Sequence, residues 1–291
     1  RLPMGMIGLA LLLLVRENGG SYGAAGLVSG AYFVATAVGA PIAGRLVDRR
    51  GQALILLRRA LIFPALLGAV CVLAALDAPL ALIGISSAAT GLFLPPVGSS
   101  LRALWPRLFV DGELRAAAYA LEASLQEITF IVGPLLVALL TALVSPILAL
   151  GAAAAIGGVG TLLVALAEPV RAWRPDERHA MSILGALESR GVITIIGLSA
   201  CLGLGFGGTE VGFPAFAEGH GGAEYGSIPL ALYAGGSLVG GLIAGAMVTM
   251  SPLRLLRVSA VVLAFGLALP LLGWSLTSMA VLAFVAGLPI A

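Results

Sequence analysis

Three glutamates stand inside long apolar stretches, where a carboxyl group could carry a proton. Glu122 and Glu127 lie in the stretch 116–143, and Glu210 lies in the Gly-rich stretch 191–216. If these stretches cross a membrane, each charged carboxylate costs about 3 kcal/mol or more, so it is retained for a role. Glu127 stands about 12 residues into its stretch, close to the membrane midplane. We therefore predict that Glu127 couples transport to protons; the alternative is a structural hydrogen bond to a neighbouring helix.

Other polar residues in the apolar stretches suggest a cavity and its supports. Arg102 ends the fourth stretch, and we expect it to form a structural charge pair with Glu122 on the next helix. Gly133-Pro134 is expected to bend the helix, because proline removes a backbone hydrogen bond. Candidates for a substrate cavity are Glu210, Tyr32, Gln126 and Tyr233.

Sequence motifs for nucleotide binding, metal binding or catalysis are weak. Residues 203–208 satisfy the dinucleotide pattern G-x-G-x-x-G, but no strand precedes them and they lie in an apolar stretch. His179 and His220 are isolated, and Cys71 and Cys201 resemble small buried residues. Neither a P-loop nor a nucleophilic triad is evident in the sequence. We therefore predict no enzyme activity, no cofactor, no metal and no nucleic-acid partner.

The composition requires a membrane. Hydrophobic residues make up 60% of the 291 residues and charged residues 10%, whereas soluble domains are about half apolar and a quarter charged. A spanning helix needs about 20 mostly apolar residues. Ten stretches are candidates, the first short and the last cut off, which suggests a partial chain: 3–15, 22–45, 53–76, 79–101, 116–143, 146–167, 191–216, 227–250, 254–275 and 278 onward.

The arginines fix the orientation, because cytoplasmic loops are enriched in positive charge. When the connections are assigned alternately to the two sides, Arg16 falls on one side. The other side receives the 46–52 turn, a predicted loop at 102–115 and a polar linker at 168–190. The arginines on that side, which we predict to be cytoplasmic, are Arg45, Arg49, Arg50, Arg58, Arg59, Arg102, Arg107, Arg115, Arg171, Arg174, Arg178, Arg190, Arg254 and Arg257.

The turn after the second stretch carries a family motif. Its sequence is Gly44-Arg45-Leu46-Val47-Asp48-Arg49-Arg50-Gly51-Gln52. It resembles the motif G-x-L-x-D-R-x-G-R/K of the major facilitator superfamily, at the position where that family carries it. We expect Gly44 to allow close helix packing and Gly51 to form a tight turn. The resemblance implies that Asp48, Arg49 and Arg50 latch the two halves of the protein in one conformation.

Two other family motifs are present only in part. Gly133-Pro134 resembles the core of the antiporter motif G-x-x-x-G-P-x-x-G-G, whose flanking glycines are absent here. The arginine of the fourth-helix motif R-x-x-Q-G is also absent, since Ser87-Ala-Ala-Thr90-Gly91 occupies its place. Gln52 replaces the final basic residue of the turn. Export is therefore favoured by a partial motif, and any proton mechanism must use another residue.

The resemblance implies an all-α membrane protein with two six-helix bundles, the second incomplete in this chain. We assign residues 1–167 to the first bundle, 168–190 to a cytoplasmic linker and 191–291 to the second bundle. The implied function is alternating-access transport, and we favour proton-coupled export of a small amphipathic molecule by a monomer in the cytoplasmic membrane. Two alternatives remain open: proton symport for uptake, and a scaffold or receptor without transport.

Overall fold

The computed structural model describes residues 1–174, 190–246 and 252–290, and this part of the chain contains helices and no strand. Each of the ten predicted spans contains helix, and within the described residues seven segments are long and apolar enough to cross a membrane. The helices are α1 (Leu2–Glu17), α2 (Tyr22–Arg50), α3 (Gln52–Ala75), α4 (Leu80–Leu92), α5 (Val97–Leu108), α6 (Gly112–Leu143), α7 (Pro146–Leu166), α8 (Glu168–Ala172), α9 (Arg190–Glu218), α10 (Ser227–Ala246), α11 (Pro252–Gly266) and α12 (Leu276–Gly287), with short 3-10 helices η2 (Ala223–Gly226) and η3 (Leu269–Leu272).

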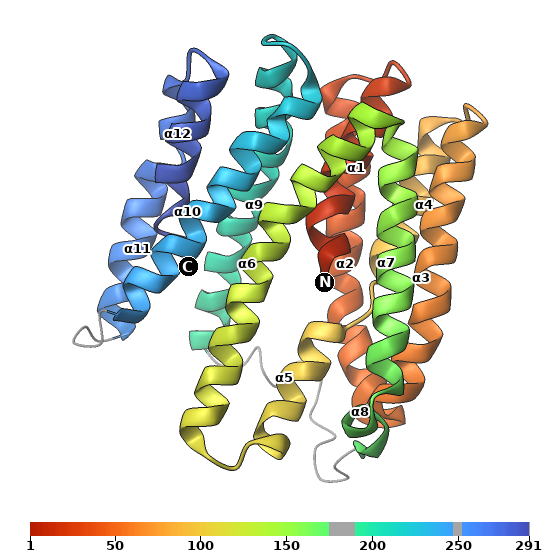
Figure 1. The fold of residues 1–291 in the computed structure, drawn as a ribbon, viewed down its shortest axis with the longest axis vertical. Coiled ribbons are helices and arrows are strands. Elements are labelled where there is room, and N and C mark those ends of the chain that lie inside the picture. Colours follow the sequence, from red (N-terminus) through yellow and green to blue (C-terminus); the bar gives the residue numbers. More distant parts are fainter. Residues whose placement is uncertain (175–189, 247–251, 291) are drawn as a thin grey trace.

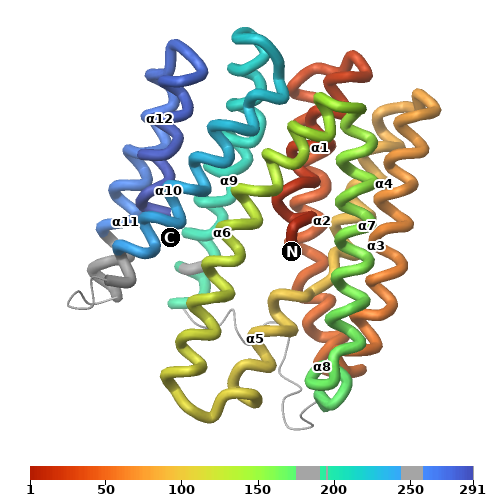
Figure 2. The backbone as a smooth tube through the Cα atoms, in the orientation of Figure 1, coloured from red at the N-terminus to blue at the C-terminus, as the bar shows by residue number. Residues whose placement is uncertain are grey.

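The long helices run side by side (Figure 1). We call α1–α7 the first bundle and α9–α12 the second bundle, which is the division predicted from the sequence. In the first bundle, α1–α7, the chief contacts join α2 to α4, α3 to α7, and α1 to α2, α6 and α7. In the second bundle, α9–α12, α10 packs on α12. The smooth trace in Figure 2 shows α6 between the two bundles, where it contacts α10. Of the predicted linker, residues 175–189 lie outside the described residues.

The largest apolar cluster surrounds α1, whose residues from Met6 to Val15 are buried. Most outward faces are apolar, with side chains such as Leu27 and Leu163 largely exposed. Such faces are stable against lipid chains and would not be stable in water. The chain is therefore a multi-pass membrane protein.

The predicted loop at 102–115 is wrong, because the fourth span breaks earlier than expected. The helix ends at Leu92, and Pro95-Pro96 prevents it from continuing. It restarts as α5, and α6 already begins at Gly112 with the side chain of Asp111 capping its first turn. The freed carbonyl groups are not left unpaired. The buried Arg59 of α3 donates to the carbonyl oxygens of Leu92 at 3.2 Å and Leu94 at 2.6 Å.

The turn between α2 and α3 is a single residue. Gly51 has φ 88°, a conformation that favours glycine, and α3 begins at the next residue. The prediction of a tight turn there is confirmed. The prediction that Gly44 allows close packing is wrong, since a β-carbon built at Gly44 would meet nothing within 4 Å.

Close helix contacts occur at other glycines. A β-carbon on Gly133 would lie 2.6 Å from the backbone of Gly5, so glycine is required where α6 crosses α1. The helix continues through Pro134 to Leu143. In the second bundle, a β-carbon on Gly236 would meet the backbone of α12 at 2.0 Å. These contacts set how closely the helices of each bundle approach.

The arginine-rich segments gather at one end of the molecule. The α2–α3 turn, the α5–α6 connection and α8 all lie at the lower end in Figure 1. We call this the arginine-rich end and the opposite one the arginine-poor end. The alternation of spans predicted from the sequence agrees with this arrangement.

The α1–α6 contact yields a stability prediction. Gly133→Ala should destabilise the protein by about 1–3 kcal/mol, the usual cost of overpacking, because its β-carbon meets the Gly5 backbone. Gly151→Ala is the control, since its β-carbon meets nothing within 4 Å and alanine favours helix by about 1 kcal/mol. Heating in detergent followed by size-exclusion chromatography measures both midpoints. Equal midpoints would contradict the contact.

Candidate functional site

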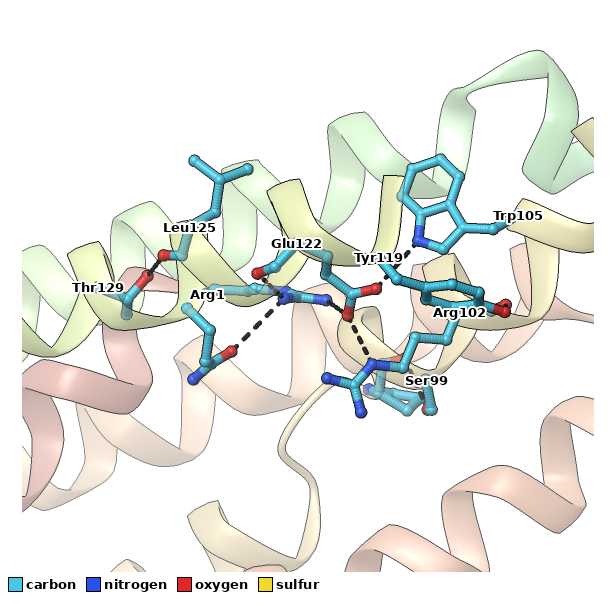
Figure 3. A network of polar contacts seen from close by, with 10 residues as sticks. Arg1, Ser99, Arg102, Trp105, Tyr119, Glu122, Leu125 and Thr129 are labelled. Atoms are coloured by element: carbon cyan, nitrogen blue, oxygen red, sulfur yellow. Dashed lines mark hydrogen bonds and ion pairs between the residues drawn. The ribbon is translucent and has the colours of Figure 1, made fainter. Parts of the chain in front are cut away.

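A buried carboxylate in the first bundle organises a polar cluster (Figure 3). Glu122 of α6 is 4% exposed. Its Oε1 accepts a hydrogen bond from Arg102 Nε of α5 at 2.8 Å and another from the guanidinium of Arg1. Its Oε2 accepts from the indole N–H of Trp105 at 3.0 Å. Two positive charges and one negative charge therefore meet here, which leaves a net charge of +1.

Local structure explains why these groups meet. Because the helix restarts after Pro96, Arg102 and Trp105 stand three residues apart on one face of α5, toward α6. Arg1 precedes α1 and also contacts Gln126 Oε1 of α6 at 3.5 Å. The small Gly98 leaves room for the Arg1 guanidinium, which a β-carbon there would approach to 3.1 Å. We call Arg1, Arg102, Trp105 and Glu122 the Glu122 cluster.

An apolar cavity of about 640 Å³ adjoins this cluster. Arg1, Trp105 and Glu122 form its polar corner. Its remaining walls are almost entirely apolar and come from α1, α3, α5, α6 and α7, with Phe63, Leu101, Leu121, Leu125 and Ile156 among them. Such a volume and lining suit a small molecule with an apolar body and one polar group.

The other two candidate acids lie at the junction of the two bundles. Glu127 is the 16th of the 32 residues of α6, and the Ser237 hydroxyl of α10 lies near its side chain without a hydrogen bond of normal geometry between them. Glu210 of α9 packs against α1, since a β-carbon on Gly8 would overlap its carboxyl group. Phe33 of α2 flanks the same glycine. Each acid thus faces a helix of the opposite bundle, whereas Glu122 faces the interior of its own.

The remaining cavity candidates are placed differently. Tyr32 is 1% exposed and belongs to the largest apolar cluster, which surrounds α1. It lies close enough to Glu210 for the two side chains to interact electrostatically. Tyr233 is buried between Phe206 and Phe213 in the second bundle. Gln126 belongs to the surroundings of Arg1, as described above. A role for these residues in substrate binding stays a prediction.

A second polar contact joins the bundles at the arginine-poor end. Arg16 of α1 forms an ion pair with Glu218 at the end of α9, and its guanidinium lies 4.3 Å from the ring centre of Tyr22. The Tyr22 hydroxyl donates to the carbonyl oxygen of Pro214 in α9 at 3.1 Å. These contacts hold α1 and α2 against α9.

The motif residues of the α2–α3 turn are exposed. Asp48, Arg49 and Arg50 point to solvent at the end of α2, and the ion pairs recorded among the described residues do not include them. Gln52 is buried, and its amide donates to the Ser100 carbonyl oxygen of α5 at 3.2 Å. The latch predicted for this turn stays a prediction.

Sequence reasoning missed Arg1, Trp105, Arg16 and Glu218 as interacting groups. Arg1 directly precedes an apolar stretch, and a charge in that position could have marked it. Nothing in the sequence pairs Arg16 with a residue 202 positions away. Among the described residues, no group of three or more His, Cys, Asp or Glu side chains could hold a metal ion.

Comparison with known proteins agrees with the fold. No curated protein matches the chain. The family model described as Major Facilitator Superfamily matches residues 1–291. This match covers the whole chain, and it agrees with the all-helical architecture and the spanning helices. The chain therefore belongs to the major facilitator superfamily and is a secondary transporter.

Proposed function

We propose that this transporter exports a small amphipathic molecule across the cytoplasmic membrane in exchange for protons, as a monomer. The observation that carries the proposal is the placement of Glu127 and Glu210 at the junction of the bundles. A carboxyl there changes its surroundings whenever the bundles move against each other. Proton binding and bundle movement are therefore linked at these two residues.

Glu127 is the stronger candidate for the coupling residue. It lies halfway along α6, and α6 is the helix of the first bundle in contact with α10. Its neighbour Ser237 is 1% exposed, and the Ser237 hydroxyl lacks a hydrogen bond of normal geometry. A buried hydroxyl in that state can donate to the carboxylate or accept from the protonated acid. The pair therefore suits a carboxyl that alternates between two protonation states.

The contacts at the arginine-poor end support alternating access. Arg16–Glu218 and Tyr22–Pro214 tie the bundles together there. We take this end to be extracellular and the linker 168–190 to be cytoplasmic, because positive charge marks the cytoplasmic side. The structure then corresponds to a state closed toward the outside. Reopening requires these contacts to break.

The amphipathic character of the cargo is inferred from the scarcity of polar groups. The central spans offer few polar candidates for a substrate cavity: Tyr32, Gln126, Glu127 and Tyr233. A sugar importer would need several hydrogen-bonding groups to replace the water around its substrate. Export is favoured over uptake by this scarcity and by the partial antiporter motif, although Gly133 of that motif also packs on Gly5.

Glu127→Gln should abolish proton-driven transport and leave exchange intact. Glutamine keeps the shape and can still form hydrogen bonds, but it cannot carry a proton. In proteoliposomes of the full-length protein, we expect net flux driven by a pH gradient to fall at least about tenfold, within the range of proton-transfer contributions. Exchange of labelled for unlabelled substrate without a gradient should persist.

The matched control is Glu113→Gln, an exposed acid in the first turn of the same helix. Its gradient-driven flux should equal that of the unmodified protein. Gradient-driven flux that survives Glu127→Gln would refute the coupling assignment. Uptake in place of efflux would favour symport, and no flux under any gradient would favour a scaffold.

Charge reversal should test closure at the arginine-poor end. Arg16→Glu places two acids together and should increase labelling of a cysteine introduced at Ala25 by an impermeant maleimide, in a background without Cys71 and Cys201. The increase should be modest, about fivefold at most, since both partners are partly exposed. Adding Glu218→Arg should return the rate toward its original value. A double variant as reactive as Arg16→Glu would exclude this ion pair from closure.

A further inference from the structure

The cavity beside the Glu122 cluster is separate from the junction of the bundles. Its walls come from α1, α3, α5, α6 and α7, all within the first bundle. Neither Glu127 nor Glu210 lines it, and the contacts that close the arginine-poor end are also elsewhere. A role for this cavity therefore does not follow from alternating access.

The cavity lies where α6 and α7 separate. These helices meet at the hairpin near Ser145 and diverge toward the arginine-rich end (Figure 1). Cavity-lining residues on both helices remain accessible: Leu121 by 62%, Leu125 by 50% and Ile156 by 38%. An apolar chain that enters between α6 and α7 would contact these side chains.

The donors of Arg1 select the head group. Arg1 lines the cavity and is 13% exposed, whereas Arg102 does not line it and is 62% exposed. Three donors already occupy both oxygens of Glu122. The Arg1 guanidinium offers several N–H donors, and apart from its bonds to Glu122 its recorded contact is at 3.5 Å to Gln126. Arg1 can therefore donate to an anionic group, whereas Glu122 has little acceptor capacity left for a cation.

We infer that this cavity binds an amphiphile with a single anionic head group, whose head pairs with Arg1 beside Trp105 and whose apolar chain lies between α6 and α7. A carboxylate or a phosphate fits the guanidinium in a bidentate manner. Such a molecule can be a lipid of the bilayer or a free amphiphile. Both molecules have this chemistry, and neither needs a proton gradient to bind at this site.

Fluorescence quenching can test the site in the full-length protein, in nanodiscs of neutral phosphatidylcholine. Trp105 is kept as the reporter, and the other tryptophans of the protein, Trp173 and Trp274 among them, are replaced by phenylalanine. The probes are a twelve-carbon carboxylate and a twelve-carbon trimethylammonium, each with a nitroxide near the head. We expect saturable quenching by the carboxylate and at least about tenfold weaker binding of the cation, the factor expected for one charge-assisted hydrogen bond.

Three variants separate this site from a nonspecific apolar void. Arg1→Gln should weaken carboxylate binding about tenfold, and Glu122→Gln should strengthen it because it removes the only negative charge. Gly160→Leu should fill the cavity, whereas Gly151→Leu, on the same helix and outside the cavity, should leave binding unchanged. Equal binding of the two probes, or carboxylate binding unaffected by Arg1→Gln and Gly160→Leu, would overturn the inference.

Mass spectrometry of the protein purified without added amphiphile distinguishes the two sources. If the purified protein retains an anionic phospholipid and the carboxylate probe displaces it, the natural occupant of the site is a lipid of the bilayer. Carboxylate binding to protein that retains no such lipid identifies the free amphiphile. Because no transport is measured, the inference can fail while the proposed proton-coupled export holds, and the reverse is equally possible.

Discussion

The first bundle depends on the need to pair the buried charges of Arg59 and Glu122 in a region with little water. Arg59 pairs with the carbonyl groups released where α4 ends, and Glu122 is surrounded by donors from α1 and α5. Each of these pairings requires a particular arrangement of helices, because the partners come from different helices. The break at Pro95-Pro96 is central to both, since it frees the carbonyl groups and also turns α5 toward α6. A local defect in one helix thus fixes the positions of several others.

Glycine contacts supply the other organising constraint. Within a bilayer, apolar side chains gain little by leaving lipid for protein, so helices associate where small residues permit close packing. Gly133 on α6 and Gly236 on α10 serve this purpose in the two bundles. The junction between the bundles has a different character, with Glu127, Glu210 and the Arg16–Glu218 pair. Close glycine contacts within the bundles therefore contrast with the polar groups at the junction, where α6 also packs extensively on α10.

The fold was largely predictable, because apolar stretches of membrane length and the placement of arginines are both visible in the sequence. The break at 93–96 was missed, since a proline pair inside an apolar stretch is compatible with either a kink or an interruption. Glu122 was correctly linked to Arg102 by position along neighbouring helices. Arg1 and Trp105 were not linked to it, because their distances from Glu122 depend on packing between helices. No local sequence pattern indicated the Arg16–Glu218 pair, because this pair also forms only through packing between helices that are distant in the sequence.

Helix α2 joins two features that lie at opposite ends of the molecule. Its 29 residues make a rod of about 43 Å, with Tyr22 bonded to α9 at one end and the Asp48 turn at the other. Gly51 is the only residue between this rod and α3, so the connection has almost no slack. Pro41 lies within α2, nine residues before its last residue, and removes one hydrogen bond of the helix. The Tyr22 contact with α9 and the turn at Gly51 are therefore the two ends of one continuous helix, and Pro41 is the position where one end can bend relative to the other.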